Sequence, residues 1–237
     1  MATTIWGASS SWTLTALPLF VWMGEILFRT KLSENLFEGL APWLQKLPGG
    51  LIHVNVVGCA LFAAISGSSA ATVATVGKMS IPELRKRKYP EKILLGSLAG
   101  SGTLGLLIPP SIILIIYGVT VQESIAKLFI AGIIPGIMIA LIFMAYVIIW
   151  SLLNKNKMPL TEENYSFLNK LSKSKQLIPV ILLILGVIGS IYTGIATATE
   201  AASLGVVGAL ILSYFQKSLN LKTFKESLLG ATKTSCM

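Results

Sequence analysis

The fold of this chain depends on the segment from Ala63 to Pro110, which begins with Ala63-Ala64-Ile65-Ser66-Gly67-Ser68-Ser69-Ala70-Ala71-Thr72 and closes with Gly100-Ser101-Gly102-Thr103-Leu104-Gly105-Leu106-Leu107-Ile108-Pro109-Pro110. Both ends place small polar residues, glycines or prolines inside apolar runs. Glycine frees the backbone and proline lacks an N–H, so these residues disfavour a continuous helix. At membrane depth, a broken helix is tolerated only where it is buried in protein or lines a water-filled cavity. The segment therefore predicts two breaks that offer polar groups to a ligand; the alternative for the prolines is a kink in a packed helix.

The composition is that of an integral membrane protein. Of the 237 residues, 54% are hydrophobic and only 12% are charged, and apolar runs recur along the whole chain. The net charge of +9 does not indicate a nucleic-acid partner, because the cations lie in loops between apolar runs, as positive-inside topology requires. We therefore expect an all-α membrane protein, a multi-pass helix bundle in the lipid bilayer.

The cysteines and the single histidine carry no metal or redox signal. Cys59 and Cys236 lie far apart, which argues against a disulfide or metal framework. His53 has no cysteine or acidic cluster beside it, and one imidazole does not make a metal site. We therefore expect a structural role for His53.

Apolar runs and basic loops together predict how the chain is threaded. The runs expected to span the bilayer cover residues 14–28, 94–118, 127–153, 177–193 and 201–215. Residues 33–47 have helical apolar spacing but carry charges, so we expect an amphipathic helix in the membrane interface that ends at Pro48-Gly49-Gly50. The basic loops fall on one face, which the positive-inside rule makes cytoplasmic.

Residues 51–81 admit two readings, one long span or a re-entrant hairpin. In the hairpin, residues 51–65 enter the membrane, residues 66–72 form the tip and residues 73–81 leave again. Only the hairpin returns the chain to the face that carries the basic loop Arg85-Lys86-Arg87-Lys88. We therefore favour the hairpin, with the broken segment 100–110 in the next span.

Two acidic residues each have a structural and a functional reading. Glu25 either pairs with Arg29 one turn later or is a functional intramembrane acid. Thr197-Ala198-Thr199-Glu200 fits a capping box at the start of the last span, although Glu200 could instead take part in coupling or gating. We favour the structural reading for both residues.

Two features that could suggest an enzyme do not support one. Residues 100–105 match G-x-G-x-x-G, but the dinucleotide motif needs a preceding strand in a soluble βαβ unit. Ser66 and Ser68 lack both the G-x-S-x-G elbow and the base that a serine hydrolase needs. The sequence therefore does not predict an enzyme.

Several stretches together resemble the large membrane subunit of the tripartite ATP-independent periplasmic (TRAP) transporters, the DctM-like family, over nearly the whole chain. They are Leu47-Pro48-Gly49-Gly50-Leu51-Ile52-His53-Val54-Asn55-Val56-Val57, Ala63 to Thr72, Ile81-Pro82-Glu83, Gly102-Thr103-Leu104-Gly105 with Ile108-Pro109-Pro110-Ser111, and Leu128-Phe129-Ile130-Ala131-Gly132. One position departs from the family pattern. Where T-P-T-E-A is usual, Ala198 replaces the proline, which would soften a helix break there.

The resemblance implies a sodium-coupled importer of organic acids that works by an elevator motion in the bacterial inner membrane. A periplasmic substrate-binding protein would deliver the substrate, such as a C4-dicarboxylate or sialic acid, and a small membrane subunit would brace the permease. No cofactor is implied besides the sodium ion that drives coupling. The resemblance also implies that the chain holds about the first half of an inverted-repeat fold.

The same resemblance implies an internal organisation. Residues 1–50 would form the first span and the interfacial helix, residues 51–126 the re-entrant hairpin and discontinuous helix of a transport domain, and residues 127–237 scaffold-type spans and the start of the second repeat. The alternative is a truncated, non-transporting remnant or a structural membrane subunit.

The resemblance places a sodium site between the hairpin tip and the broken helix. The expected ligands are the side chains of Ser66 and Ser69 and the backbone at Gly105, Ile108 and Pro110. The substrate is expected beside Gly67, Ser68, Thr103 and Pro109. No other metal is expected.

Overall fold

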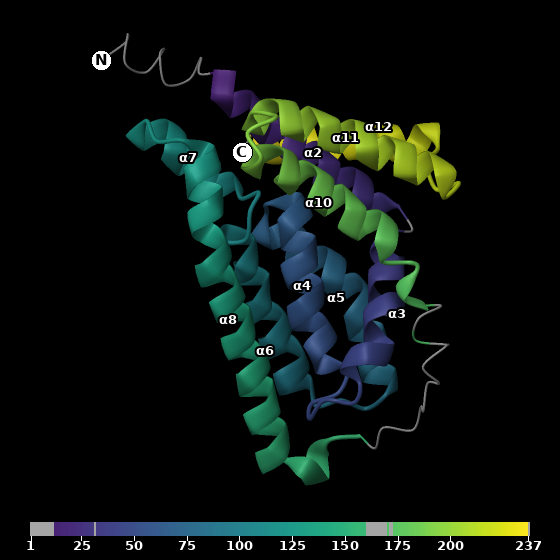
Figure 1. Cartoon of the computed structure of the whole chain (residues 1–237). Coiled ribbons are helices and arrows are strands. Elements are labelled where there is room, and N and C mark those ends of the chain that lie inside the picture. Colours follow the sequence, from purple (N-terminus) through teal and green to yellow (C-terminus); the bar gives the residue numbers. More distant parts are fainter. Residues whose placement is uncertain (1–11, 31, 160–169, 171–172, 237) are drawn as a thin grey trace.

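The structure is a computed structural model that describes residues 12–30, 32–159, 170 and 173–236 (Figure 1). In this part of the chain every regular element is helical, which confirms the all-α prediction. The α-helices are α2 (Ala16–Arg29), α3 (Leu32–Leu44), α4 (Ile52–Ser66), α5 (Ser69–Lys86), α6 (Glu91–Gly102), α7 (Ile112–Val121), α8 (Ile125–Leu153), α10 (Ile178–Tyr192), α11 (Ala198–Phe215) and α12 (Leu221–Ser235). Short 3₁₀ helices are η1 (Trp12–Thr15), η2 (Thr103–Leu106) and η3 (Lys155–Lys157).

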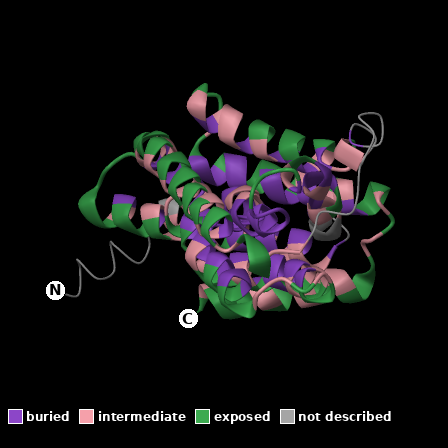
Figure 2. Ribbon diagram, turned by 90° about the horizontal axis from the view of Figure 1, so that it is seen from below, coloured by how far each residue is buried: buried purple, intermediate pink, exposed green. Residues whose placement is uncertain are grey.

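The helices form two groups that share one core. Figure 1 shows α2, α10, α11 and α12 stacked across one end of the molecule, while α4, α5, α6 and α8 run away from that end. Phe20 and Met23 of α2 pack in one buried cluster with Phe62 of α4 and Ala201 of α11. Figure 2 shows the buried positions gathered in the middle of the bundle. The core therefore joins the two groups rather than filling each one separately.

Two helices in the described residues are long and apolar enough to cross a membrane, α8 and α11. Along α8, large apolar side chains such as Ile134, Leu141 and Ile149 are exposed. Exposed apolar surface on this scale is unfavourable in water and suits contact with lipid or with another membrane segment. The helices α4, α7 and α10 are apolar but shorter.

The first predicted break separates two helices that pack against each other. The helix α4 ends at Ser66, and Gly67 then adopts a left-handed conformation with φ of 59°. Ser68 follows in extended conformation and caps α5 by accepting a hydrogen bond from the Ala71 N–H. The tip of this helical hairpin is therefore narrower than the expected residues 66–72, because Gly67 and Ser68 alone reverse the chain.

The returning arm of the hairpin is longer than predicted. We expected it to end near residue 81, before a basic loop, but α5 continues through Pro82 to Lys86. Arg85 and Lys86 therefore lie in its last turn rather than in a loop. Cations are favourable there because they face the negative end of the helix dipole.

The second predicted break interrupts the segment between α6 and α7. The helix α6 ends at Gly102, η2 follows, and α7 does not begin until Ile112. The Pro109–Pro110 peptide bond is cis, and the Ser111 hydroxyl donates to the Leu106 carbonyl at 2.8 Å. The structure therefore has a genuine interruption here and not a kink in one helix.

The amphipathic helix ends earlier than expected. The helix α3 stops at Leu44, and residues 45–50 turn the chain, with positive φ at Gly49 and Gly50. The Leu51 N–H then donates to the Tyr89 hydroxyl at 3.1 Å, which ties the start of α4 to the loop before α6. Burial raises the pKa of Tyr89.

The structural readings of His53 and Glu200 agree with the structure. His53 is fully buried, and its Nε2 lies 2.8 Å from the Pro48 carbonyl oxygen. Glu200 accepts from the Thr197 N–H at 2.8 Å, and the Thr197 hydroxyl accepts from the Glu200 N–H at 3.4 Å, which is a complete capping box.

Thr197→Ala is expected to lower the free energy of unfolding by about 1 kcal/mol, the usual value of a lost N-cap. Thermal unfolding in detergent measures this change. Thr232→Ala is the control, because the exposed Thr232 hydroxyl donates only to the Leu228 carbonyl of its own helix. A Thr197→Ala protein as stable as the control would show that the capping box contributes nothing to α11.

Candidate functional site

The hairpin tip and the broken helix meet backbone to backbone. The Ile112 N–H, at the start of α7, donates to the Gly67 carbonyl at 3.2 Å. A Cβ atom on Gly67 would lie 2.6 Å from the Pro110 carbonyl oxygen, and one on Gly105 would lie 3.0 Å from the Ser69 nitrogen. Glycine at these two positions is what allows the two breaks to approach so closely.

Several hydroxyl groups of the tip are buried. Ser66 and Thr72 are buried, and their hydroxyl oxygens lie 3.0 Å apart. The Ser68 N–H donates to the Ser66 hydroxyl at 3.4 Å. The Ser69 hydroxyl is buried and has no hydrogen-bond partner in the described chain. An orphaned buried hydroxyl is costly, because it has lost water without gaining a partner.

The ends of two helices and the starts of two others converge here. The helix α4 ends and α5 begins at the tip, while η2 ends within the break and α7 begins after it. Carbonyl ends of helices favour a cation and N–H ends favour an anion. Hydroxyl and carbonyl oxygens are ligands that hard cations accept, and unwound membrane helices supply them in transporters. The oxygen-rich centre therefore fits a small cation better than a soft metal.

The predicted cation ligands lie around this centre on both breaks. Ser66 and Ser69 come from the tip; Gly105 and Pro110 are buried in the break and face the tip backbone. Ile108 is half-buried, and its side chain packs beside Gly136 of α8 and against the cluster of Val56, Ala63 and Leu104. Its side chain is therefore occupied in packing, which leaves its backbone as the group that could act at the site.

The residues expected beside the substrate do not all gather in one place. Gly67 and Pro109 are buried and Ser68 is half-buried, but the Pro109 ring lies on the side of α8, where a Cβ atom on Gly132 would be 3.6 Å from its Cγ. Thr103 lies in η2, is exposed, and donates its hydroxyl to the Gly100 carbonyl at 2.7 Å. The Thr103 hydroxyl is therefore turned back onto its own helix.

Sequence reasoning missed the glycines that support the junction from outside. A Cβ atom on Gly24 of α2 would lie 2.7 Å from the Ser66 Cα, and one on Gly132 of α8 would lie 2.6 Å from the Leu107 carbonyl oxygen. These helices therefore press directly on the tip and on the break. A lone glycine within an apolar run could have indicated these contacts. Glycine weakens a helix, so its presence there suggests close packing against another segment.

The acid near the first span is part of an ion-pair network. The Arg29 Nε donates to Glu25 at 3.0 Å, and the Arg29 Nη1 donates to Glu226 of α12 at 3.1 Å. The Trp22 indole N–H donates to the Ser227 hydroxyl at 3.2 Å beside them. Glu25 therefore pairs with Arg29 as expected, and Arg29 also joins α2 to α12, which the sequence did not predict.

The described residues contain no group of three histidines, cysteines or acids that could hold a metal ion. Cys59 and Cys236 are both free thiols. The tip and the break, residues 66–72 and 100–110, carry only uncharged side chains.

Comparison with known proteins shows the family of the chain. The DctM component family of the tripartite ATP-independent periplasmic transporters matches residues 1–237, the whole chain. The chain belongs to the DctM family. Members of this family are transporter permeases and not enzymes, which agrees with the absence of an enzyme motif in the sequence.

Relatives with different stated substrates resemble the chain about equally. The C4-dicarboxylate TRAP transporter large permease protein DctM of Pseudomonas aeruginosa is 33% identical over all of this chain and 55% of its own length. The sialic acid large permease protein SiaM of Vibrio cholerae is 33% identical over 98% of this chain and 54% of its own length. The isethionate permease protein DctMQ of Oleidesulfovibrio alaskensis is 36% identical over 96% of this chain and 36% of its own length. This DctM-family chain therefore spans about half the length of the large permease proteins it matches.

Proposed function

We propose that this chain forms part of the large permease subunit of a sodium-coupled TRAP importer of organic acids. The observation that carries the proposal is the junction of the two breaks, where the backbone at Gly67 and Ser69 lies against that at Pro110 and Gly105 and the buried Ser69 hydroxyl has no hydrogen-bond partner among the described residues. A sodium ion bound there would satisfy the Ser69 oxygen and bridge the two segments.

The helix ends support an anionic substrate next to the cation. The N-termini of α5 and α7 both open at the junction, and helix N-termini attract carboxylates. Relatives are named for C4-dicarboxylates, sialic acid and isethionate, all of which carry an anionic group. We assign a carboxylate or similar oxyanion to this side of the site, near Gly67, Ser68 and Pro109. Thr103 is the weakest member of the proposed set, because its hydroxyl is already engaged.

The proposal extends to the assembly and its membrane placement. The α4–α5 pair would be a re-entrant hairpin and, with the α6–α7 discontinuous helix, part of a moving transport domain over residues 51–126. Residues 1–50 and 127–237 would supply the first span with its interfacial helix and the scaffold-type spans. A small membrane subunit and a periplasmic substrate-binding protein would complete the system in the bacterial inner membrane; the name DctMQ supports the small-subunit partner.

The alternative is a non-transporting remnant or a structural membrane subunit. The chain spans about half the length of relatives such as DctM of Pseudomonas aeruginosa, and a transporter site between two repeats needs both repeats. Sodium-dependent uptake in proteoliposomes with the partner proteins, with and without the second half of a relative, separates the two. Uptake in either preparation would support the transport function, and no uptake in both would favour the alternative.

Ser66→Ala and Ser69→Ala are each expected to weaken sodium binding about tenfold, because each removes one oxygen ligand from a buried cation. The measurement is the midpoint of thermal unfolding of the chain in detergent as a function of sodium concentration, with potassium as the reference cation. Ser190→Ala is the matched control, because the Ser190 hydroxyl donates to the Val187 carbonyl within α10, away from the junction.

The sodium assignment predicts different outcomes for the control and for the two tip variants. The control should keep the wild-type response to sodium, and both tip variants should lose most of it while remaining folded. Unchanged sodium dependence in Ser66→Ala and Ser69→Ala would mean that the ion does not bind at the junction.

A further inference from the structure

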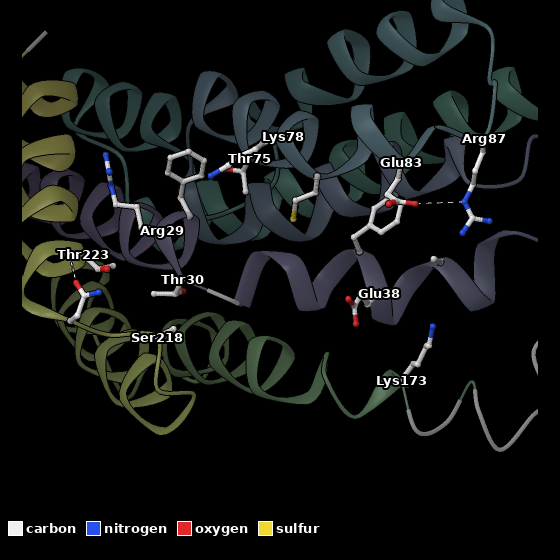
Figure 3. A pocket seen from close by; sticks show the side chains of 15 residues that line it. Arg29, Thr30, Glu38, Thr75, Lys78, Glu83, Arg87, Lys173, Ser218 and Thr223 are labelled. Atoms are coloured by element: carbon white, nitrogen blue, oxygen red, sulfur yellow. Dashed lines mark hydrogen bonds and ion pairs between the residues drawn. The ribbon is translucent and has the colours of Figure 1, made fainter. Parts of the chain in front are cut away.

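A second site lies apart from the junction, in a polar cavity of about 760 Å³. It is bounded by the end of α2, by α3 and α5, and by the segment that leads into α12 (Figure 3). Of the described residues, none from the hairpin turn or from the break between α6 and α7 lines it. Its size lies within the range of about 300–1,000 Å³ that is usual for small-molecule sites.

One cation in this cavity has no carboxylate partner. Lys78 of α5 is exposed, and its Nζ lies 5.6 Å from the centroid of the Phe28 ring without forming an ion pair in the described chain. Arg29 lies on the same ring, with its Cζ 5.8 Å from the centroid, but Glu25 and Glu226 already pair with it. The ammonium of Lys78 is therefore available to an oxyanion, whereas that of Lys173, which also lines the cavity, already has a partner.

One carboxylate in the same cavity is also unpaired. Glu38 of α3 is exposed and forms no ion pair with a described residue, whereas Glu83 lies 3.7 Å from Arg87. Glu38 and Lys78 line one cavity from facing helices, yet they do not pair with each other. Figure 3 shows both among the side chains around the cavity.

Helix ends of opposite partial charge also border the cavity. The C-terminal end of α2 reaches it at Thr30, and the N-terminal end of α12 reaches it at Asn220 and Thr223. A helix C-terminus is partially negative and an N-terminus is partially positive. A purely anionic or purely cationic ligand would therefore leave one charged group of the cavity uncompensated.

We propose that this cavity binds a small zwitterion, with Lys78 receiving its oxyanion and Glu38 its ammonium group. The ligand chemistry is a phosphate or carboxylate joined by a short linker to an amine, which occurs both in free solutes and in the phosphatidylethanolamine headgroup. Opposite charges on one ligand satisfy both side chains at once and need no net charge in the cavity. The site goes beyond the proposed transport function and does not depend on the sodium ion.

The test uses the whole chain in detergent, with phosphoethanolamine as the probe and binding followed by isothermal titration. Lys78→Ala and Glu38→Gln are each expected to weaken binding about tenfold, because each removes one charge-assisted contact. Lys92→Ala and Glu123→Gln are the matched controls, since both residues are exposed and lie outside the cavity. Inorganic phosphate and ethanolamine, which each carry charge of only one sign, should bind at least tenfold more weakly than the zwitterion.

A lipid arm identifies the source of the ligand. In nanodiscs, competition of phosphatidylethanolamine against the probe assigns the site to the lipid headgroup, and undiminished probe binding assigns it to a free zwitterion. Three results would overturn the proposal: no saturable binding of phosphoethanolamine to the wild type, equal losses in the control variants, or phosphate binding as tight as that of the probe. None of these readouts involves uptake, so their failure is distinct from failure of the transport function.

Discussion

Gly67→Ala is expected to separate the hairpin tip from the broken helix and to abolish sodium-dependent stabilisation. Gly67 has a φ of 59°, where an L-residue pays about 1–2 kcal/mol. The added Cβ would also lie 2.6 Å from the Pro110 carbonyl oxygen, and such overpacking costs about 1–3 kcal/mol. The free energy of unfolding should therefore fall by about 3 kcal/mol, as measured by denaturation in detergent with sodium and with potassium.

Gly194→Ala isolates the conformational part of this effect. Gly194 also has a positive φ, of 72°, but a Cβ atom there meets nothing within 4 Å. Its substitution should cost only about 1–2 kcal/mol and leave the response to sodium unchanged. Equal losses in the two variants would mean that the approach of Gly67 to Pro110 has no energetic importance, and a retained sodium response in Gly67→Ala would place the ion elsewhere.

Gly24→Val is expected to have the second-largest effect, although Gly24 lies outside both breaks. A Cβ atom on Gly24 would lie 2.7 Å from the Ser66 Cα and 2.9 Å from its Cβ. Backbone atoms yield little, so a valine would push α2 away from the tip and cost about 3 kcal/mol. Because Ser66 is displaced with the tip, sodium affinity should fall at least tenfold in the same titration.

Gly189→Val is the matched control for Gly24→Val. Gly189 lies inside the apolar helix α10, and a Cβ atom there meets nothing within 4 Å. The valine should change stability by less than about 1 kcal/mol, since only helix propensity differs. A Gly24→Val protein that unfolds and responds to sodium like this control would show that α2 does not support the tip.

The two breaks were predictable because their cause is local. Glycine and proline act on the backbone at their own positions. Gly67 and Pro109-Pro110 therefore predict helix interruptions without any knowledge of their neighbours in the folded chain. The capping box at Thr197 and Glu200 is local in the same way, since both partners lie within one turn. Helix ends were less predictable: α5 continues to Lys86 because its cations suit a helix C-terminus as well as they suit a loop.

The contacts between distant segments were not predictable from composition or periodicity. The sequence around Gly24 does not indicate that Ser66 is its neighbour, and the sequence around Arg29 does not indicate an ion pair with Glu226. The resemblance to a family supplied the pairing of the tip with the break, while the residues alone predicted only that each backbone was interrupted. The cavity of Lys78 and Glu38 was missed altogether, because it forms from helices that become neighbours only on folding.

The sequence by itself determined that this is an all-α membrane protein, where its helices break and which family it resembles. These properties follow from hydropathy, charge and backbone chemistry, which each residue carries with it. Only the tertiary structure showed how closely the backbone at Gly67 and Ser69 approaches that at Pro110 and Gly105, and that the buried Ser69 hydroxyl has no partner among the described residues. Burial and close approach depend on residues far apart in the chain, and packing alone brings them together.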